Sequence, residues 1–152
     1  MPTLAIHNPA TGALLAELPA DDAASVAAKA VAARAAQPAW AEVPMNQRLA
    51  MVQRFRAALV AELDTLATTL TQEMGKPIAQ ARNELNGLLP RLDFFLEQAE
   101  GSVRDEHVFE GGGMREKIAH IPLGVVANIS AWNYPYFVGG NVFVPALLTG
   151  NA

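Results

Sequence analysis

The polar turn Trp132-Asn133-Tyr134 carries the side chain best suited to chemistry in this sequence. A neutral amide such as that of Asn133 donates hydrogen bonds to an oxygen atom without acting as an acid or a base. Such a donor can stabilise negative charge that develops on a substrate oxygen. The same side chain could instead cap a helix that begins at Pro135, because asparagine is a common capping residue. The residues alone leave both interpretations open.

Two predicted elements position this turn. Residues 123–129 form a short, continuous apolar run, which is typical of a strand buried on both faces of a sheet. Residues 135–148 follow as a helix that begins at a proline and is closed by Gly150. A buried strand that leads through a polar loop into a helix is the unit that builds ligand sites in α/β folds. We therefore expect Asn133 at the exit of that strand.

The N-terminal part predicts a β-hairpin and an alanine-rich helix. Residues 4–18 have the pattern of strand, turn and strand, with the turn at Asn8-Pro9-Ala10-Thr11-Gly12. Asp21-Asp22 should cap the helix that follows, and Gln37-Pro38 should stop it.

Apolar periodicity predicts two more helices. Apolar residues recur every three or four positions from Leu49 to Leu70, which indicates one long helix that Gly75 ends in a left-handed conformation. A third helix spans about residues 78–100. Its proline, Pro90, predicts a kink or a break near Leu89, since an interior proline costs about 3 kcal/mol. The expected buried side of this third helix consists of Ile78, Ala81, Leu85, Leu88, Leu92 and Phe95 or Leu96.

Composition excludes several classes of function. The 152 residues are 51% hydrophobic and 17% charged, so the chain is not of the disordered class. The net charge of −4, with eleven scattered Lys and Arg, argues against nucleic-acid and anionic-membrane partners. Cysteine is absent, and His7, His107 and His120 lack ligand spacing, so we expect no metal site. Without a signal-peptide or membrane-span pattern, the expected location is the cytoplasm. The sequence by itself shows no phosphate-binding glycine loop.

An ordered set of motifs resembles the N-terminal third of the aldehyde dehydrogenase superfamily, and the resemblance covers nearly the whole chain. It is similar above all to bacterial members that act on semialdehydes or other small aldehydes. The most specific feature is the spacing between the segment that begins at Pro122 and the one that begins at Trp132. The motifs are Asn8-Pro9-Ala10-Thr11-Gly12, Trp40, Glu73-Met74-Gly75-Lys76-Pro77, Pro122-Leu123-Gly124-Val125-Val126, Trp132-Asn133-Tyr134-Pro135, Pro145-Ala146-Leu147 and Gly150-Asn151-Ala152.

This resemblance implies NAD- or NADP-dependent oxidation of a small aldehyde to a carboxylic acid. In the family a cysteine thiolate attacks the carbonyl, hydride passes to the nicotinamide, and a glutamate activates water. Asn133 matches the asparagine that stabilises the oxyanion, whereas Tyr134 and Phe137 would fall near the aldehyde channel. The residues that match the nicotinamide-ribose side of the cofactor cleft are Ile129, Ser130, Ala131 and Trp132. Ser130-Ala131 departs from the commoner pair before Trp-Asn.

The resemblance also implies an α/β architecture, in which an N-terminal hairpin and helices precede the first strand and helix of a truncated Rossmann-like cofactor domain. The expected divisions are a hairpin and helical part (1–105), an extended bridging or oligomerisation segment (106–121, extended at 114–120) and the start of the cofactor-binding core (122–152). The family's glutamate base and cysteine would lie beyond Ala152. The chain is therefore expected to be an inactive fragment, and the full-length enzyme a homo-oligomer. The alternatives are a non-catalytic interaction or oligomerisation module and an independent helical ligand-binding protein.

Three residues of these motifs have a structural interpretation. Glu73 and Lys76 are expected to be charges at a helix end, with Lys76 as the counter-charge at the C-terminus. Trp40 is expected to be a packing anchor.

Overall fold

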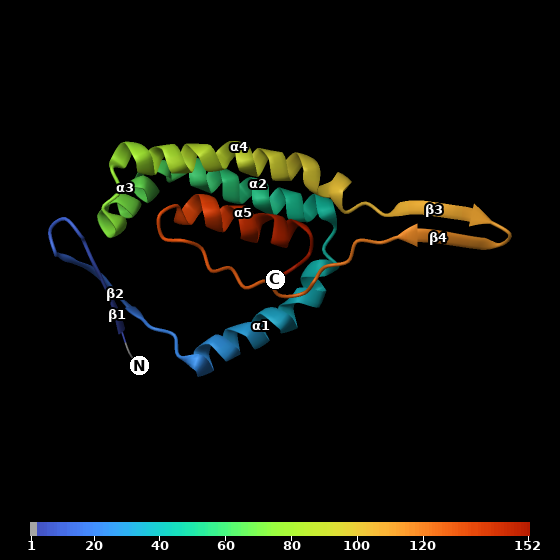
Figure 1. Cartoon of the computed structure of the whole chain (residues 1–152), viewed down its shortest axis with the longest axis horizontal. Helices are drawn as coiled ribbons and strands as arrows, with labels where there is room; N and C mark the ends of the chain where they lie inside the picture. Colours follow the sequence, from blue (N-terminus) through green and yellow to red (C-terminus); the bar gives the residue numbers. More distant parts are fainter. Residues whose placement is uncertain (1–2) are drawn as a thin grey trace.

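The computed structural model describes residues 3–152, which form five helices and two separate two-stranded sheets (Figure 1). Residues 1 and 2, the first of the predicted 1–105 part, lie outside the described residues. Strands β1 (Thr3–His7) and β2 (Leu14–Pro19) pair antiparallel. The predicted N-terminal hairpin and the mixed α/β class are therefore confirmed.

Helix α1 (Ala23–Ala41) begins at the predicted cap but runs past the predicted stop. The Asp22 carboxylate accepts a hydrogen bond from the Ser25 N–H at 2.8 Å. The predicted end at Gln37-Pro38 is wrong, because tertiary contacts hold the last turn. Trp40 Nε1 donates to the Leu147 carbonyl at 2.9 Å, as befits the expected packing anchor, and Gln37 Nε2 donates to the Gly150 carbonyl at 3.0 Å.

The single long helix predicted from the apolar periodicity between Leu49 and Leu70 is divided in two. Helix α2 (Met45–Ala61) and helix α3 (Leu63–Met74) meet at Glu62, whose φ of −104° and ψ of 13° leave the helical range. The turn lets α2 pack on both α4 and α5 while α3 packs on α4. Gly75 ends α3 with φ 70°, as predicted.

Helix α4 (Ile78–Ser102) continues through Pro90, so the predicted break does not occur. Pro90 and Asn86, whose carbonyl loses its partner there, are both exposed, and water can bond that carbonyl. Ile78 is 37% exposed and does not belong to the buried side. The predicted residues that are buried are Ala81, Leu85, Leu88 and Leu92.

The main core lies between α4, α2 and helix α5 (Pro135–Leu148), which run side by side (Figure 1). The contact between α4 and α5 is close at Gly140, where an added Cβ would lie 2.6 Å from Leu88 Cδ1. Gly140 is thus a packing residue. The core cluster consists of Val52, Leu59, Leu88, Leu92, Ala99, Val144 and Leu148.

A second hairpin projects beyond the helices (Figure 1). Strands β3 (Glu106–Gly111) and β4 (Met114–Ile118) pair antiparallel, and the predicted extended conformation is confirmed over β4. The turn residues Gly112 and Gly113 have φ of 59° and 80°, a region that glycine enters readily.

The predicted strand at residues 123–129 is wrong. The segment has no regular structure, and Leu123 and Ile129 are 94% and 96% exposed. Its backbone does begin a parallel pairing, since Val126 N–H donates to the Ala152 carbonyl at 2.7 Å and Ala152 N–H to the Gly124 carbonyl at 2.9 Å. One such rung does not make a strand, because a doubly buried strand needs neighbours and covering layers on both faces.

Candidate functional site

Asn133 lies in the turn that leads into α5, and its side chain does not cap that helix. The N-cap residue is Tyr134, no side chain caps from it, and Pro135 occupies the first turn. The capping alternative is therefore wrong. Asn133 is exposed, and its side-chain amide makes no hydrogen bond to any other residue within 3–152. Both amide N–H groups are free to bind a ligand.

The turn borders a hollow of about 460 Å³ between α4 and the start of α5. Asn133, Tyr134 and Phe137 all line it, so the structure brings together the three residues that were assigned to oxyanion and aldehyde binding. The remaining lining residues come from α4 and from the first turns of α5. They are Asn83, Glu84, Gly87 and Val138.

A buried ion pair that the sequence interpretation missed supports the wall of this hollow. Lys76 Nζ lies 2.6 Å from Glu84 Oε2, and the two side chains are 9% and 0% exposed. The interpretation of Lys76 as a counter-charge at a helix end is wrong. The missed signal was the position of Glu84, three residues after Ala81 and four before Leu88, in the middle of an apolar stripe.

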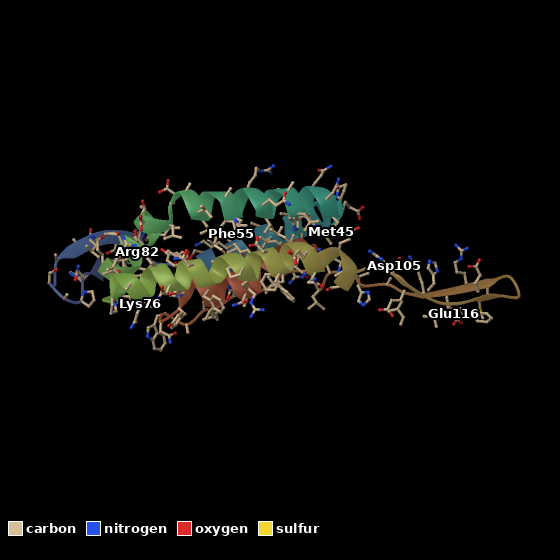
Figure 2. The ribbon with its side chains drawn as sticks, turned by 90° about the horizontal axis from the view of Figure 1, so that it is seen from above. Met45, Phe55, Lys76, Arg82, Asp105 and Glu116 are labelled. Carbon is tan, nitrogen blue, oxygen red and sulfur yellow. The ribbon has the colours of Figure 1, made fainter. Side chains whose placement is uncertain are left out.

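The same pair contacts the turn and the helix that follows. Glu84 Oε1 accepts hydrogen bonds from the Tyr136 and Phe137 N–H groups at 2.8 and 3.1 Å. Lys76 Nζ donates to the Asn133 carbonyl at 2.8 Å and lies 3.5 Å from the centre of the Tyr134 ring. In Figure 2 Lys76 lies at the end of the helical layer opposite to the β3–β4 hairpin.

Tyr136 directs its hydroxyl from α5 to α3. Its phenol donates to the Leu66 carbonyl at 3.3 Å. Burial, followed by the negative charges of Glu73 and Glu84, raises the pKa of the Tyr136 phenol above its ordinary value. This hydroxyl stays neutral at physiological pH, whereas Glu73 remains an exposed charge in the last turn of α3.

The four residues assigned to the cofactor form one stretch directly before Asn133. Ile129 and Trp132 are 96% and 74% exposed. The Ser130 hydroxyl donates to Asn128 Oδ1 at 2.9 Å, and Asn128 Nδ2 donates to the Gly139 carbonyl at 3.3 Å, which ties the stretch to α5. Ala131 is exposed between Ser130 and Trp132.

These residues fit the nicotinamide-ribose end of a dinucleotide. Ile129 and Trp132 offer uncovered apolar surface for a flat ring, and a large exposed apolar surface commonly marks a binding site. The Ser130 hydroxyl oxygen can still accept a hydrogen bond from a ribose hydroxyl.

Within residues 3–152 no group of three or more His, Cys, Asp or Glu side chains is arranged to hold a metal ion. The helices described there are too short or too polar to cross a membrane.

Comparison with known proteins gives a family match over residues 2–152, to the aldehyde dehydrogenase family. The chain is 37% identical over 99% of its length to 3,6-anhydro-alpha-L-galactose dehydrogenase from Streptomyces coelicolor. It is 36% identical over 98% of its length to N-succinylglutamate 5-semialdehyde dehydrogenase from Chromobacterium violaceum. In both cases it spans 30% of the relative's own length.

The structure also superimposes on solved aldehyde dehydrogenases over nearly its whole length. The crystal structure of an aldehyde dehydrogenase from Brucella melitensis biovar abortus 2308 superimposes with a TM-score of 0.92 and 28% identity. The match covers 99% of this chain and 31% of that one, so the two-sheet, five-helix arrangement corresponds to about a third of the complete fold.

Proposed function

Because the chain belongs to the aldehyde dehydrogenase family, we propose that it supplies the Asn133 donor and one wall of the cofactor cleft to an enzyme that oxidises a small aldehyde to a carboxylic acid with NAD or NADP. The semialdehyde dehydrogenases among the relatives favour a small aldehyde with a second polar group. The relatives are about three times as long as this chain, and the proposal concerns an enzyme of their length. We call this larger protein the complete enzyme.

The observation that carries the proposal is the free side-chain amide of Asn133 at the edge of the hollow. When a nucleophile adds to the aldehyde carbon, the carbonyl π electrons move to oxygen and create an oxyanion. The Asn133 N–H donates to that oxygen more strongly as its charge develops, so it stabilises the transition state more than the substrate. Its neutrality prevents it from protonating the intermediate.

The residues of the chain that face the cofactor would bind and orient its nicotinamide end. Ile129 and Trp132 would hold the nicotinamide against their apolar surfaces, and Ser130 and Ala131 would face the ribose. When bound, the nicotinamide supplies a hydride acceptor. Tyr134 and Phe137 would line the aldehyde's approach and exclude water from it.

We further propose that residues 1–152 alone do not oxidise aldehydes, because they contain no cysteine to act as the family's nucleophile. We also propose the same divisions for the complete enzyme: a hairpin and helical part (1–105), a bridging or oligomerisation segment (106–121) and the start of the cofactor-binding core (122–152).

The test is Asn133→Ala in the complete enzyme, made by fusing this chain to the remaining two thirds of the Streptomyces coelicolor relative. Loss of one oxyanion donor should lower kcat about 100- to 1000-fold, with little change in cofactor Kd. Asn86→Ala removes a matched amide from the exposed side of α4, outside the hollow, and should leave kcat unchanged. Equal losses in kcat and cofactor affinity would refute the oxyanion role.

The β3–β4 hairpin favours an additional, non-catalytic function as an association arm for a second copy of the chain. Its exposed apolar side chains include Val108 at 59%, Met114 at 54% and Ile118 at 51%, on a strand pair that projects from the helices (Figure 1). Val108→Ser with Ile118→Ser should lower the oligomer mass in sedimentation of the complete enzyme. Retention of the wild-type mass would exclude the arm.

A further inference from the structure

The Lys76–Glu84 pair is buried more completely than any other ion pair within residues 3–152, and it lies beside the proposed site. A buried pair is weak evidence for stability, because the loss of hydration offsets much of the attraction between the charges. Such a pair can be retained for the geometry that it imposes. We propose that Lys76 and Glu84 are positioning residues that fix the Asn133 turn for catalysis, an inference that rests on the proposed function of Asn133.

Glu84 fixes the helix that follows the turn. The first N–H groups of a helix have no partner within it, and α5 has no side-chain cap from its own N-cap residue. Glu84 Oε1 satisfies two of these groups, those of Tyr136 and Phe137, from 52 and 53 residues away. Its negative charge is also favourable at the positive end of the helix dipole. The start of α5 is therefore held against α4 by one carboxylate.

Lys76 fixes the turn itself. Its ammonium has three N–H groups, and three acceptors surround it: Glu84 Oε2, the Asn133 carbonyl and the face of the Tyr134 ring. A bond to the Asn133 carbonyl fixes the peptide plane that follows Asn133 and hence limits the directions of its side chain. Gly75, with φ 70°, turns the chain so that Lys76 reaches this place.

Lys76 acts through Asn133 and does not take part in proton transfer. Each of the three N–H groups of the ammonium has a partner within the protein, so none remains to donate to a substrate. The role proposed for Lys76 is therefore to set the position of a donor. A displacement of about 1 Å in a catalytic group can cost roughly 100-fold in rate.

The first arm of the test uses kinetics of the complete enzyme. Lys76→Met should lower kcat about 10- to 100-fold with an unchanged cofactor KM. The matched control is Arg82→Met, which breaks the exposed Arg82–Asp64 pair (2.8 Å, 49% and 77% exposed) between α4 and α3. Both residues lie at the same end of the helical layer (Figure 2). Arg82→Met should leave kcat within about twofold of wild type, as expected for an exposed pair.

The double variant separates positioning from general stability. If Lys76 acts through Asn133, Lys76→Met in the Asn133→Ala background should reduce kcat no further, because the two changes remove one interaction. Losses that multiply would overturn the inference while leaving the role of Asn133 intact. If Asn133→Ala alone keeps full kcat, the proposed function fails, and the second arm decides the geometry.

The second arm uses NMR of the 152-residue chain. The Tyr134 N–H belongs to the same peptide group as the Asn133 carbonyl, so Lys76→Met should shift and broaden its signal, and Arg82→Met should not. If Lys76→Met does not fold, Lys76→Arg replaces it in this test. A planar guanidinium keeps the positive charge but cannot point its N–H donors in the three directions of the ammonium. An unchanged Tyr134 signal in the folded variant would overturn the inference.

Discussion

The contact between α4 and α5 sets the position of the proposed site, and Gly140→Ala perturbs it directly. A Cβ at residue 140 would lie 2.6 Å from Leu88 Cδ1 and 3.5 Å from Leu88 Cδ2. Leu88 is only 2% exposed, so it has little room to move. Overpacking of this kind destabilises by about 1–3 kcal/mol. The change from glycine to alanine within a helix opposes this by about 1 kcal/mol.

Gly87→Ala is the matched control on the facing helix. A Cβ there would meet only Phe137 Cε2, at 4.0 Å, which is an ordinary contact. This variant should therefore gain the helix propensity of about 1 kcal/mol without any overlap. The difference between the unfolding free energies of the two variants isolates the overlap with Leu88 and should be about 1–3 kcal/mol.

The assay is urea denaturation of the 152-residue chain followed by far-ultraviolet circular dichroism, with equal m-values required for comparison. Leu88→Ala alone should destabilise by about 2–5 kcal/mol. Combined with Gly140→Ala it should destabilise by less than the sum, because the new methyl group occupies part of the vacated space. Stabilisation by Gly140→Ala equal to that by Gly87→Ala would refute the close packing of α4 on α5.

Three further predictions concern the Asp22 cap, the Asn151 side chain and the Tyr136 phenol. The Asp22 carboxylate accepts the Ser25 N–H, which lowers its pKa below 3.8, so its contribution to α1 should be lost as pH falls through that value. Asp22→Ala should reduce this acid dependence of helix content, and an undiminished one would contradict the cap. Asn151 is 6% exposed and its side-chain oxygen accepts the Gly124 N–H, so Asn151→Ala should destabilise by about 1–3 kcal/mol and speed exchange of that amide. The raised pKa of Tyr136 contributes stability below about pH 10 that is lost as pH rises, and Tyr136→Phe should remove this alkaline loss from the unfolding curve.

The sequence correctly predicted those structural elements that are determined by residues close together in the chain. The N-terminal hairpin follows from a turn cluster, α1 from the Asp22 cap, and the end of α3 from Gly75 in a left-handed conformation. Each of these depends on residues within a few positions of one another, so a sequence displays them directly.

The errors arose where distant contacts override local signals. The last turn of α1 passes Pro38 because Trp40 bonds a carbonyl more than 100 residues away. The expected strand at 123–129 has the correct apolar pattern, yet a strand also requires partners, and in this structure it makes one rung with Ala152.

The candidate site shows the same division. The Asn133 turn could be located from its motif, and the structure places Tyr134 and Phe137 around the same hollow. The role of the Lys76–Glu84 pair could not be assigned from pattern alone, because the Asn133 carbonyl and the Tyr136 N–H that it contacts lie 50 or more residues away along the chain. An acid in an apolar stripe was the available signal.

The anchoring of α5 at both ends has a consequence for the order in which the chain assembles. Glu84 of α4 satisfies its first N–H groups, and Trp40 of α1 satisfies a carbonyl of its last turn. Thr149 and Asn151, which lie nearby in sequence, donate to carbonyls of the last turn, but no nearby side chain caps the first N–H groups. An isolated α5 would therefore begin with open hydrogen-bonding groups. During synthesis the earlier helices emerge first, and they can form the packing surface before the apolar α5 follows. We expect α5 to fold onto this surface rather than to nucleate it, and the Asn133 turn to become ordered last.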